Sequence, residues 1–121
     1  MAHLSRLIIF CRGNAGLLKT TQFFNSSLAL PVVRTTDNFA ELRCARSGVN
    51  LTLQATEDET QLSSSYSPIM TFEVPEMDET IAAAVTAGGI MDGPVKFKEF
   101  GRVAQVRVGE GGVMVGFFER A

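Results

Sequence analysis

The chain has 121 residues, of which 45% are apolar and 20% are charged, a composition typical of one soluble globular domain. Its formal net charge is −2 and the basic residues are scattered, which argues against nucleic acid or an anionic membrane as a partner. No apolar run approaches the roughly 18 residues of a membrane span. The two cysteines, Cys11 and Cys44, lie inside apolar strand patterns, so we expect a cytoplasmic protein with buried free thiols rather than a disulfide or reactive thiols.

The first half of the chain is predicted to contain one helix among four strands. The run "LSRLIIFCR" (4–12) is apolar and partly β-branched, and it predicts a strand. In residues 14–28 apolar side chains recur near a 3.6-residue spacing, which predicts a helix with Asn14 as its N-cap and Pro31 just beyond its end. Three further strand patterns lie at 32–36, 39–46 and 49–56. The turn signals "DN" and "SG" between these three strands fit hairpins.

The second half repeats this order after the polar stretch "EDETQLSSSYS", which is the linker-like region of the chain. Residues 68–74 predict a strand, and the alanine-rich residues 76–89 predict a helix that ends on a glycine. Three more strand patterns close the chain, at 95–100, 102–108 and 112–119. The order of elements is therefore β-α-β-β-β, twice.

The two halves also match in sequence. With a shift of 64 residues, residues 40–54 fall on residues 104–118, Arg43 meets Arg107, and apolar positions meet apolar positions. This match and the shared order of elements indicate a duplication. The predicted organisation is one domain (1–121) with a first module at about 4–56, a linker at 57–67 and a second module at about 68–119.

A tandem β-α-β-β-β chain of this length resembles the vicinal-oxygen-chelate superfamily, which includes glyoxalases, bleomycin-resistance proteins and extradiol dioxygenases. "IIFCRG" is similar to the family's first strand and its exit into the helix, and "FFNSSLALPVV" to the end of that helix. "SPIMTFEVPEMDETIAAAVTAGG" and "GPVKFKEFGRVAQVRVGEGGVMVGFFE" resemble the opening and the closing strands of the second module. The resemblance implies an α+β fold in which each module curls a mixed sheet into half a barrel, with the helix on the convex side and a central pocket on the concave side.

Alternation along the strands then assigns side chains to the two faces of each sheet. Leu7, Ile9 and Cys11 are expected to pack under the first helix. Residues of the opposite phase are candidates for the ligand-binding pocket, and they are Arg6, Ile8, Phe10, Glu41, Arg43, Asn50, Thr52, Gln54, Ile69, Thr71, Glu73, Gln105, Arg107, Met114, Gly116 and Phe118.

Metal-dependent members of the family take one ligand from the first and one from the fourth strand of each module. The resemblance places these positions at Arg6, Thr52, Ile69 and Gly116. A cation, a lone hydroxyl, an aliphatic side chain and a glycine do not make a ligand set for a divalent ion. We therefore expect no metal and no other cofactor, and we expect Gly116 to be a vacated ligand position that opens room in the cavity.

Several polar candidates keep two interpretations. Glu41, Arg43, Gln105 and Arg107 either pair with one another at a solvated barrel mouth or orient a polar ligand. Glu73 is either a wet residue near a strand end or a buried general base with a raised pKa.

The remaining candidates are less informative. Phe10, Met114 and Phe118 form either plain core or an apolar floor for a planar ligand. His3 is expected to be solvated near the terminus, and Tyr66 is either an ordinary loop aromatic or a residue that reaches over the pocket.

Three functions fit these expectations, and the first is favoured. It is a metal-independent protein, similar to bleomycin-resistance proteins, that binds a small, partly apolar molecule in the concave pocket. The second is a metal-dependent lyase or dioxygenase of the glyoxalase type, in which carboxylates such as Glu41, Glu73 or Glu119 hold the metal. The third is a regulatory or structural subunit whose own side chains fill the pocket. A homodimer is expected, because half-barrels leave strand edges and apolar walls to cover and small members of the family pair.

Overall fold

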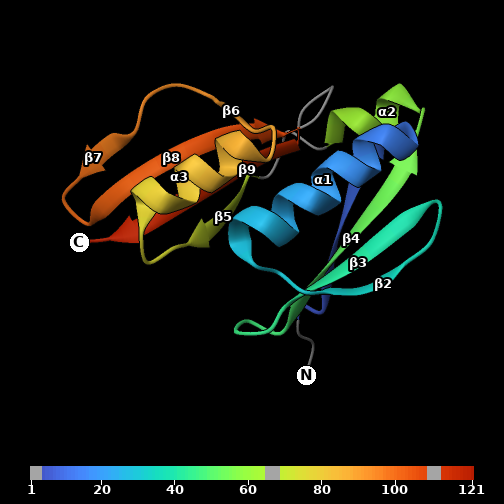
Figure 1. Cartoon of the computed structure of the whole chain (residues 1–121), viewed down its shortest axis with the longest axis horizontal. Helices are drawn as coiled ribbons and strands as arrows, with labels where there is room; N and C mark the ends of the chain where they lie inside the picture. Colours follow the sequence, from blue (N-terminus) through green and yellow to red (C-terminus); the bar gives the residue numbers. More distant parts are fainter. Residues whose placement is uncertain (1–3, 65–68, 109–112) are drawn as a thin grey trace.

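The structure is a computed structural model that describes residues 4–64, 69–108 and 113–121, so the candidates His3 and Tyr66 lie outside the described residues. Its first half contains β1 (Arg6–Arg12), α1 (Gly13–Leu28), β2 (Val32–Thr35), β3 (Phe39–Cys44), β4 (Val49–Thr56) and α2 (Glu59–Ser63). Its second half contains β5 (Met70–Glu73), α3 (Met77–Thr86), β6 (Ile90–Met91), β7 (Lys96–Lys98), β8 (Gly101–Val108) and β9 (Val113–Arg120). Figure 1 shows the two halves side by side, each with a helix against its own strands.

Three local features differ from the sequence-based expectations. The prediction that Asn14 caps α1 is wrong, because the helix begins at Gly13, whose positive φ of 61° allows the sharp turn out of β1. The polar stretch predicted as a linker contains the short helix α2, where the Asp58 side chain accepts a hydrogen bond from the Thr60 N–H at 2.9 Å. The strand expected at 95–100 is observed as β7, and β6 precedes it as an additional short strand.

Each half builds one mixed sheet, and neither sheet closes into a barrel. The strand order is β1-β4-β3-β2 in the first sheet and β5-β9-β8-β6 in the second, where β7 also pairs with β8. In the first sheet β1 pairs parallel with β4, which pairs antiparallel with β3. In the second sheet β5 pairs parallel with β9, which pairs antiparallel with β8. The predicted α+β architecture with two β-α-β-β-β sheets is therefore confirmed.

The pairing registers repeat with the same offset as the sequence. Cys44 pairs with Val49 at the turn of the β3–β4 hairpin, and Val108 pairs with Val113 at the turn of the β8–β9 hairpin. Both partners are thus displaced by 64 residues. In the parallel pairs Leu7 lies opposite Leu51 and Met70 lies opposite Val115, so β4 and β9 keep the offset of 64 whereas β1 and β5 are offset by 63.

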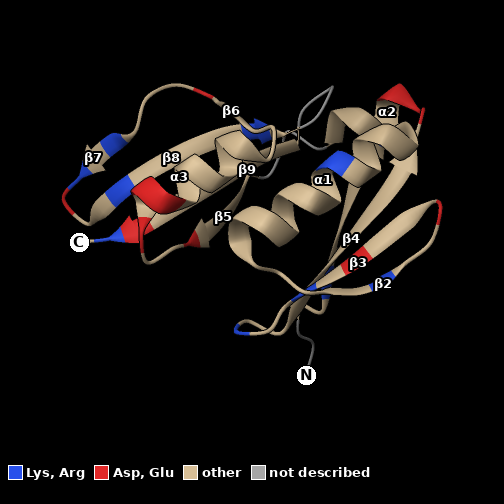
Figure 2. Cartoon of the chain, in the orientation of Figure 1, with Lys and Arg blue, Asp and Glu red and all other residues tan. Residues whose placement is uncertain are grey.

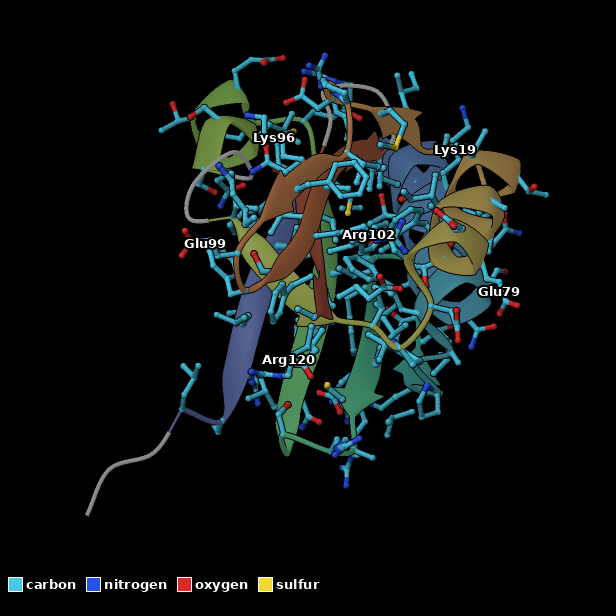
Figure 3. The ribbon with its side chains drawn as sticks, turned by 90° about the vertical axis from the view of Figure 1, so that its left-hand side faces the viewer. Lys19, Glu79, Lys96, Glu99, Arg102 and Arg120 are labelled. Atoms are coloured by element: carbon cyan, nitrogen blue, oxygen red, sulfur yellow. The ribbon has the colours of Figure 1, made fainter. Side chains whose placement is uncertain are left out.

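The apolar core lies between the two helices and the inner faces of the sheets. Its largest fully buried side chains include Phe23, Phe24, Leu53, Met77 and Phe117. The two halves meet through this core, where the rings of Phe24 on α1 and Phe72 on β5 lie 5.9 Å apart. Both long helices therefore cover the same side of the molecule, and the opposite sheet faces remain open (Figures 1 and 3).

The charged residues are scattered over the structure, as the near-balance of basic and acidic residues suggests. Basic and acidic residues are interspersed over both halves (Figure 2). Among the described residues, no helix is long and apolar enough to cross a membrane.

Candidate functional site

The predicted site residues lie on the sheet faces that point away from α1 and α3, which we call the open faces. In the first sheet the helix-facing positions include the buried Ile9, Leu42, Leu51 and Leu53. Strand alternation then places Arg6, Ile8, Phe10, Glu41, Arg43, Asn50, Thr52 and Gln54 on the open face. In the second sheet it places Ile69, Thr71, Glu73, Gln105, Arg107, Met114, Gly116 and Phe118 on the open face.

Cross-strand pairing brings Ile8, Thr52 and Glu41 into one row across the first open face. Thr52 is only 8% exposed, and its hydroxyl has no hydrogen-bond partner within the described part of the chain. The same is true of the Oδ1 atom of Asn50, two residues earlier on β4. A buried polar atom without a partner costs roughly 1–3 kcal/mol, and a hydrogen bond to these two residues of β4 would offset that cost.

Sequence reasoning missed one residue of this row. Arg34 on β2 pairs with Glu41, and its Nη2 atom lies 3.9 Å from Glu41 Oε2. The side chain of Glu41 is 13% exposed, whereas that of Arg34 is 65% exposed, so the pair partly balances a mostly buried carboxylate. The pairing of Arg34 with Glu41 follows from an irregularity in the strand register between Val32 and Arg34, and no pattern in the sequence indicates this irregularity.

The second open face is organised around the row Thr71, Gly116 and Gln105. A Cβ atom added at Gly116 would lie 2.8 Å from Thr71 Oγ1 and 3.4 Å from Ile69 Cγ2. The expectation that Gly116 opens room in a cavity is therefore wrong. The space beside it is taken by the Thr71 side chain, which would have to shift if residue 116 carried a Cβ atom.

The charged candidates pair with neighbours other than those expected. Arg107 was expected to pair with Glu41, Arg43 or Gln105. It pairs instead with Asp92, and the Arg107 Nη2 atom lies 3.0 Å from Asp92 Oδ1. Glu73 is exposed and pairs with Arg120 at 2.8 Å, and this hydrogen bond lowers the pKa of the Glu73 carboxyl. The structure therefore supports the interpretation of Glu73 as a solvated residue near a strand end, because a general base would need a raised pKa.

The metal-dependent alternative relies on the carboxylates of Glu41, Glu73 or Glu119, and the structure places these three residues apart. Glu119 lies on the helix-facing side of β9, where it accepts hydrogen bonds from the Met77 N–H and from Arg102. Glu41 and Glu73 lie on the open faces of different sheets. Among residues 4–64, 69–108 and 113–121, no group of three or more His, Cys, Asp and Glu side chains could hold a metal ion.

The four positions that the sequence analysis assigned to metal ligands by resemblance form two matched pairs. Ile69 flanks Gly116 in the second sheet, and the shared register places Arg6 beside Thr52 in the same way in the first. One neutral hydroxyl is the only donor that these four residues offer. Arg6 would also place a positive charge next to the ion, so the residues present do not fit a divalent metal.

A cavity of about 730 Å³ lies elsewhere, between the two halves of the molecule. Its wall comes from β1, the β3–β4 hairpin, β5 and the end of β9, and only Thr71 and Glu73 of the predicted site residues line it. The cavity therefore lies apart from most of the residues that the sequence assigns to a concave pocket. It lies where β1 and β5, which belong to different halves, both line one space.

No protein-family profile and no curated protein sequence matches the chain, but solved structures do. A glyoxalase-related enzyme from Fulvimarina pelagi matches with a TM-score of 0.78 at 14% identity, over 99% of this chain and 89% of that one. The fosfomycin resistance protein FosX from Listeria monocytogenes, in complex with Mn(II), matches with a TM-score of 0.75 at 15% identity, over 98% and 90%. An antibiotic-binding protein from a Streptomyces species matches with a TM-score of 0.71 at 15% identity, over 100% and 98%. These likenesses span both halves of the chain and show a common fold.

Proposed function

We propose that this chain, which has the fold of the vicinal-oxygen-chelate superfamily, is a metal-independent protein that binds a small, partly apolar molecule on its open faces. The observation that carries the proposal is the donor set at the two matched pairs, Arg6 with Thr52 and Ile69 with Gly116. The fold provides positions for a metal, and this sequence fills them with residues that do not bind one. FosX keeps the same fold in complex with Mn(II), so the fold alone does not decide the chemistry.

The chemistry of the open faces supports binding of a mixed polar and apolar ligand. Ile8 is 51% exposed and Ile69 is 40% exposed, so each face offers apolar surface. On the first open face, Asn50 Oδ1 and the Thr52 hydroxyl have no hydrogen-bond partner among the described residues. A ligand with an apolar ring would cover an exposed isoleucine side chain, and one N–H or O–H donor on that ligand would bond to one of these two oxygen atoms.

The proposed assembly is a homodimer in which the open face of one chain is covered by that of another. The exposed Ile8 and Ile69 need such a cover, and β2 presents the further exposed side chains Val32 and Val33 at the edge of the first sheet. Pairing of open faces would enclose the ligand and bury these side chains together. The antibiotic-binding protein from Streptomyces shows that this fold serves ligand binding in at least one other protein.

The test is a thermal-shift screen with EDTA present throughout, with bleomycin and a panel of aromatic antibiotics as the compounds. We expect at least one of these compounds to raise the melting temperature, since a ligand that binds only the folded state stabilises it. Thr52→Val should reduce that shift without lowering the melting temperature of the free protein, because it removes a hydroxyl that has no partner in the described chain. A screen in which no compound acts, while added Mn(II) or Zn(II) stabilises the protein, would support the metal-dependent alternative instead.

A further inference from the structure

The cavity between the two halves is bordered by two strand edges. β1 and β5 each pair with a neighbour on one side only in the described part of the chain, and their free edges face each other across the gap. Figure 1 shows β5 beside the C-terminal end of α1, at the border between the two halves. We call this cavity the inter-edge cleft.

The floor of the inter-edge cleft is apolar. It is formed by side chains that continue the helix-facing surfaces of both sheets beyond the end of α1, such as Leu7, Leu51, Met70 and Phe72. These residues are part of the core or pack against it, so the floor is held by rigid elements. A volume of about 730 Å³ falls inside the range of roughly 300–1,000 Å³ that is common for small-molecule sites.

The mouth of the cleft carries an excess of positive charge. Arg46, Arg120 and Glu73 all line it, and Arg120 already pairs with Glu73. Figure 3 labels Arg120, which is the last residue of β9. Arg46 forms no ion pair with any described residue, although it lies near enough to Glu73 to help lower the pKa of that carboxyl.

The second carboxylate at the mouth does not cancel this excess. Glu119 is held by Arg102 at 2.6 Å and by the backbone N–H of Met77. One arginine charge is therefore left for a ligand, at the edge of an apolar floor. A single carboxylate matches that charge, whereas a doubly charged phosphate would also be repelled by Glu73.

We propose that the inter-edge cleft is a second ligand site, separate from the open faces, that takes a small amphipathic monocarboxylate. The apolar body lies on the floor formed by both sheets, and the carboxylate lies against Arg46 at the mouth. This site does not depend on the proposed function of the open faces. Occupancy would bridge the two halves, so the ligand should also stabilise the protein.

Cys44 provides a reporter for the test, because this partly exposed thiol lines the cleft. The second cysteine, Cys11, is buried, and burial raises its pKa to about 11, so it does not compete for thiol reagents near neutral pH. The probe is decanoate, and decanol serves as the matched compound without a charge. We expect decanoate to slow the modification of Cys44 and to raise the melting temperature, and we expect decanol to do both more weakly.

Two arginine variants separate the cleft from the open faces. Arg46→Ala should weaken decanoate about fivefold, the effect of losing one exposed charge pair, and leave decanol unchanged. Arg43→Ala removes an exposed arginine on the first open face that does not line the cleft, and it should leave decanoate binding unchanged.

A steric variant keeps the proposal testable if the charge effect is small. Ser47 lies in the exposed turn at the rim, so Ser47→Trp should fill the cleft, abolish protection of Cys44 and leave the fold intact. The proposal is overturned if decanoate fails to protect Cys44, if decanol protects it equally, or if Arg43→Ala rather than Arg46→Ala weakens decanoate. These results leave the proposed function of the open faces unaffected.

Discussion

Glu119, near the end of the last strand, accepts a hydrogen bond of 2.7 Å from the backbone N–H of Met77, the first residue of α3. The residue that precedes α3, Glu76, makes no side-chain cap, so Glu119, which lies 42 positions after Met77, performs this role. Arg102 holds the same carboxylate from the neighbouring strand β8. The pair Glu119 and Met77 therefore ties the start of α3 to the far end of the second sheet.

Stability should fall in acid because of this carboxylate. The Met77 N–H and then Arg102 hold the pKa of Glu119 below its ordinary value of 4.5. A lowered pKa in the folded state means that the stabilisation is complete above about pH 4.5 and is lost as the pH falls through the folded value. Denaturant unfolding between about pH 7 and pH 3 measures this loss.

Glu119→Gln is the matched variant, because it keeps an oxygen acceptor for Met77 and removes the charge. It should melt a few degrees lower than the wild type near neutral pH and should show a shallower decline in acid. Glu73 and Glu59 also have lowered pKa values and remain in both proteins, so the difference between the two curves isolates Glu119. Parallel curves would contradict the assigned role.

Gly116 should tolerate a side chain only when Thr71 is shortened. A Cβ at residue 116 would meet Thr71 Oγ1 at 2.8 Å, which forces Thr71 out of its rotamer, so Gly116→Ala should cost about 1 kcal/mol. In a Thr71→Ala background the contact is absent, and the same change should stabilise by about 0.5 kcal/mol through the unfolded state. A double-mutant cycle from chemical unfolding measures the coupling, and additive effects would refute it.

One thiol per chain should react quickly in the folded protein. Cys44 is partly exposed, whereas Cys11 is buried and burial raises its pKa to about 11, so little thiolate forms at Cys11 below that pH. Ellman's reagent near pH 8 measures the count, with Cys44→Ser as the control that should lose the fast phase. Two fast thiols, or a fast phase that survives in the control, would contradict this placement of the cysteines.

The proposed homodimer should depend on the open faces rather than on the helix surface. Light scattering should give twice the chain mass of 13.1 kDa. Ile8→Glu places a charge on the first open face and should give a folded monomer, because Ile8 is half exposed in the single chain. Leu18→Glu changes a similarly exposed residue on α1 and should remain a dimer, so a dimer in both variants would place the interface elsewhere.

The faces of the strands were predictable from the sequence because strand side chains alternate strictly. Ile9 and Cys11 are buried under α1 as predicted, and the 64-residue repeat predicted the register that places Thr52 and Gly116 at equivalent positions. The N-cap of α2 also had a local signal, since Asp58 precedes the helix.

Features that depend on contacts between distant segments were not predictable in this way. Nothing near Gly116 in sequence indicates that Thr71 occupies the space beside it. The pairing of Arg34 with Glu41 depends on an irregular register, and the inter-edge cleft depends on how the two sheets are placed relative to each other. Local patterns specify which face a residue takes, and tertiary packing decides what that face meets.

If the open faces bind a ligand without a metal, protein purified without chelators should carry none, and elemental analysis measures its metal content. Arg6, Thr52, Ile69 and Gly116 offer one neutral oxygen donor in total, and a divalent ion needs several donors that converge on one point. We expect zinc, nickel, manganese and iron all to be far below one equivalent per chain, and we expect EDTA to leave the melting temperature unchanged. One equivalent of tightly held metal per chain would contradict this expectation.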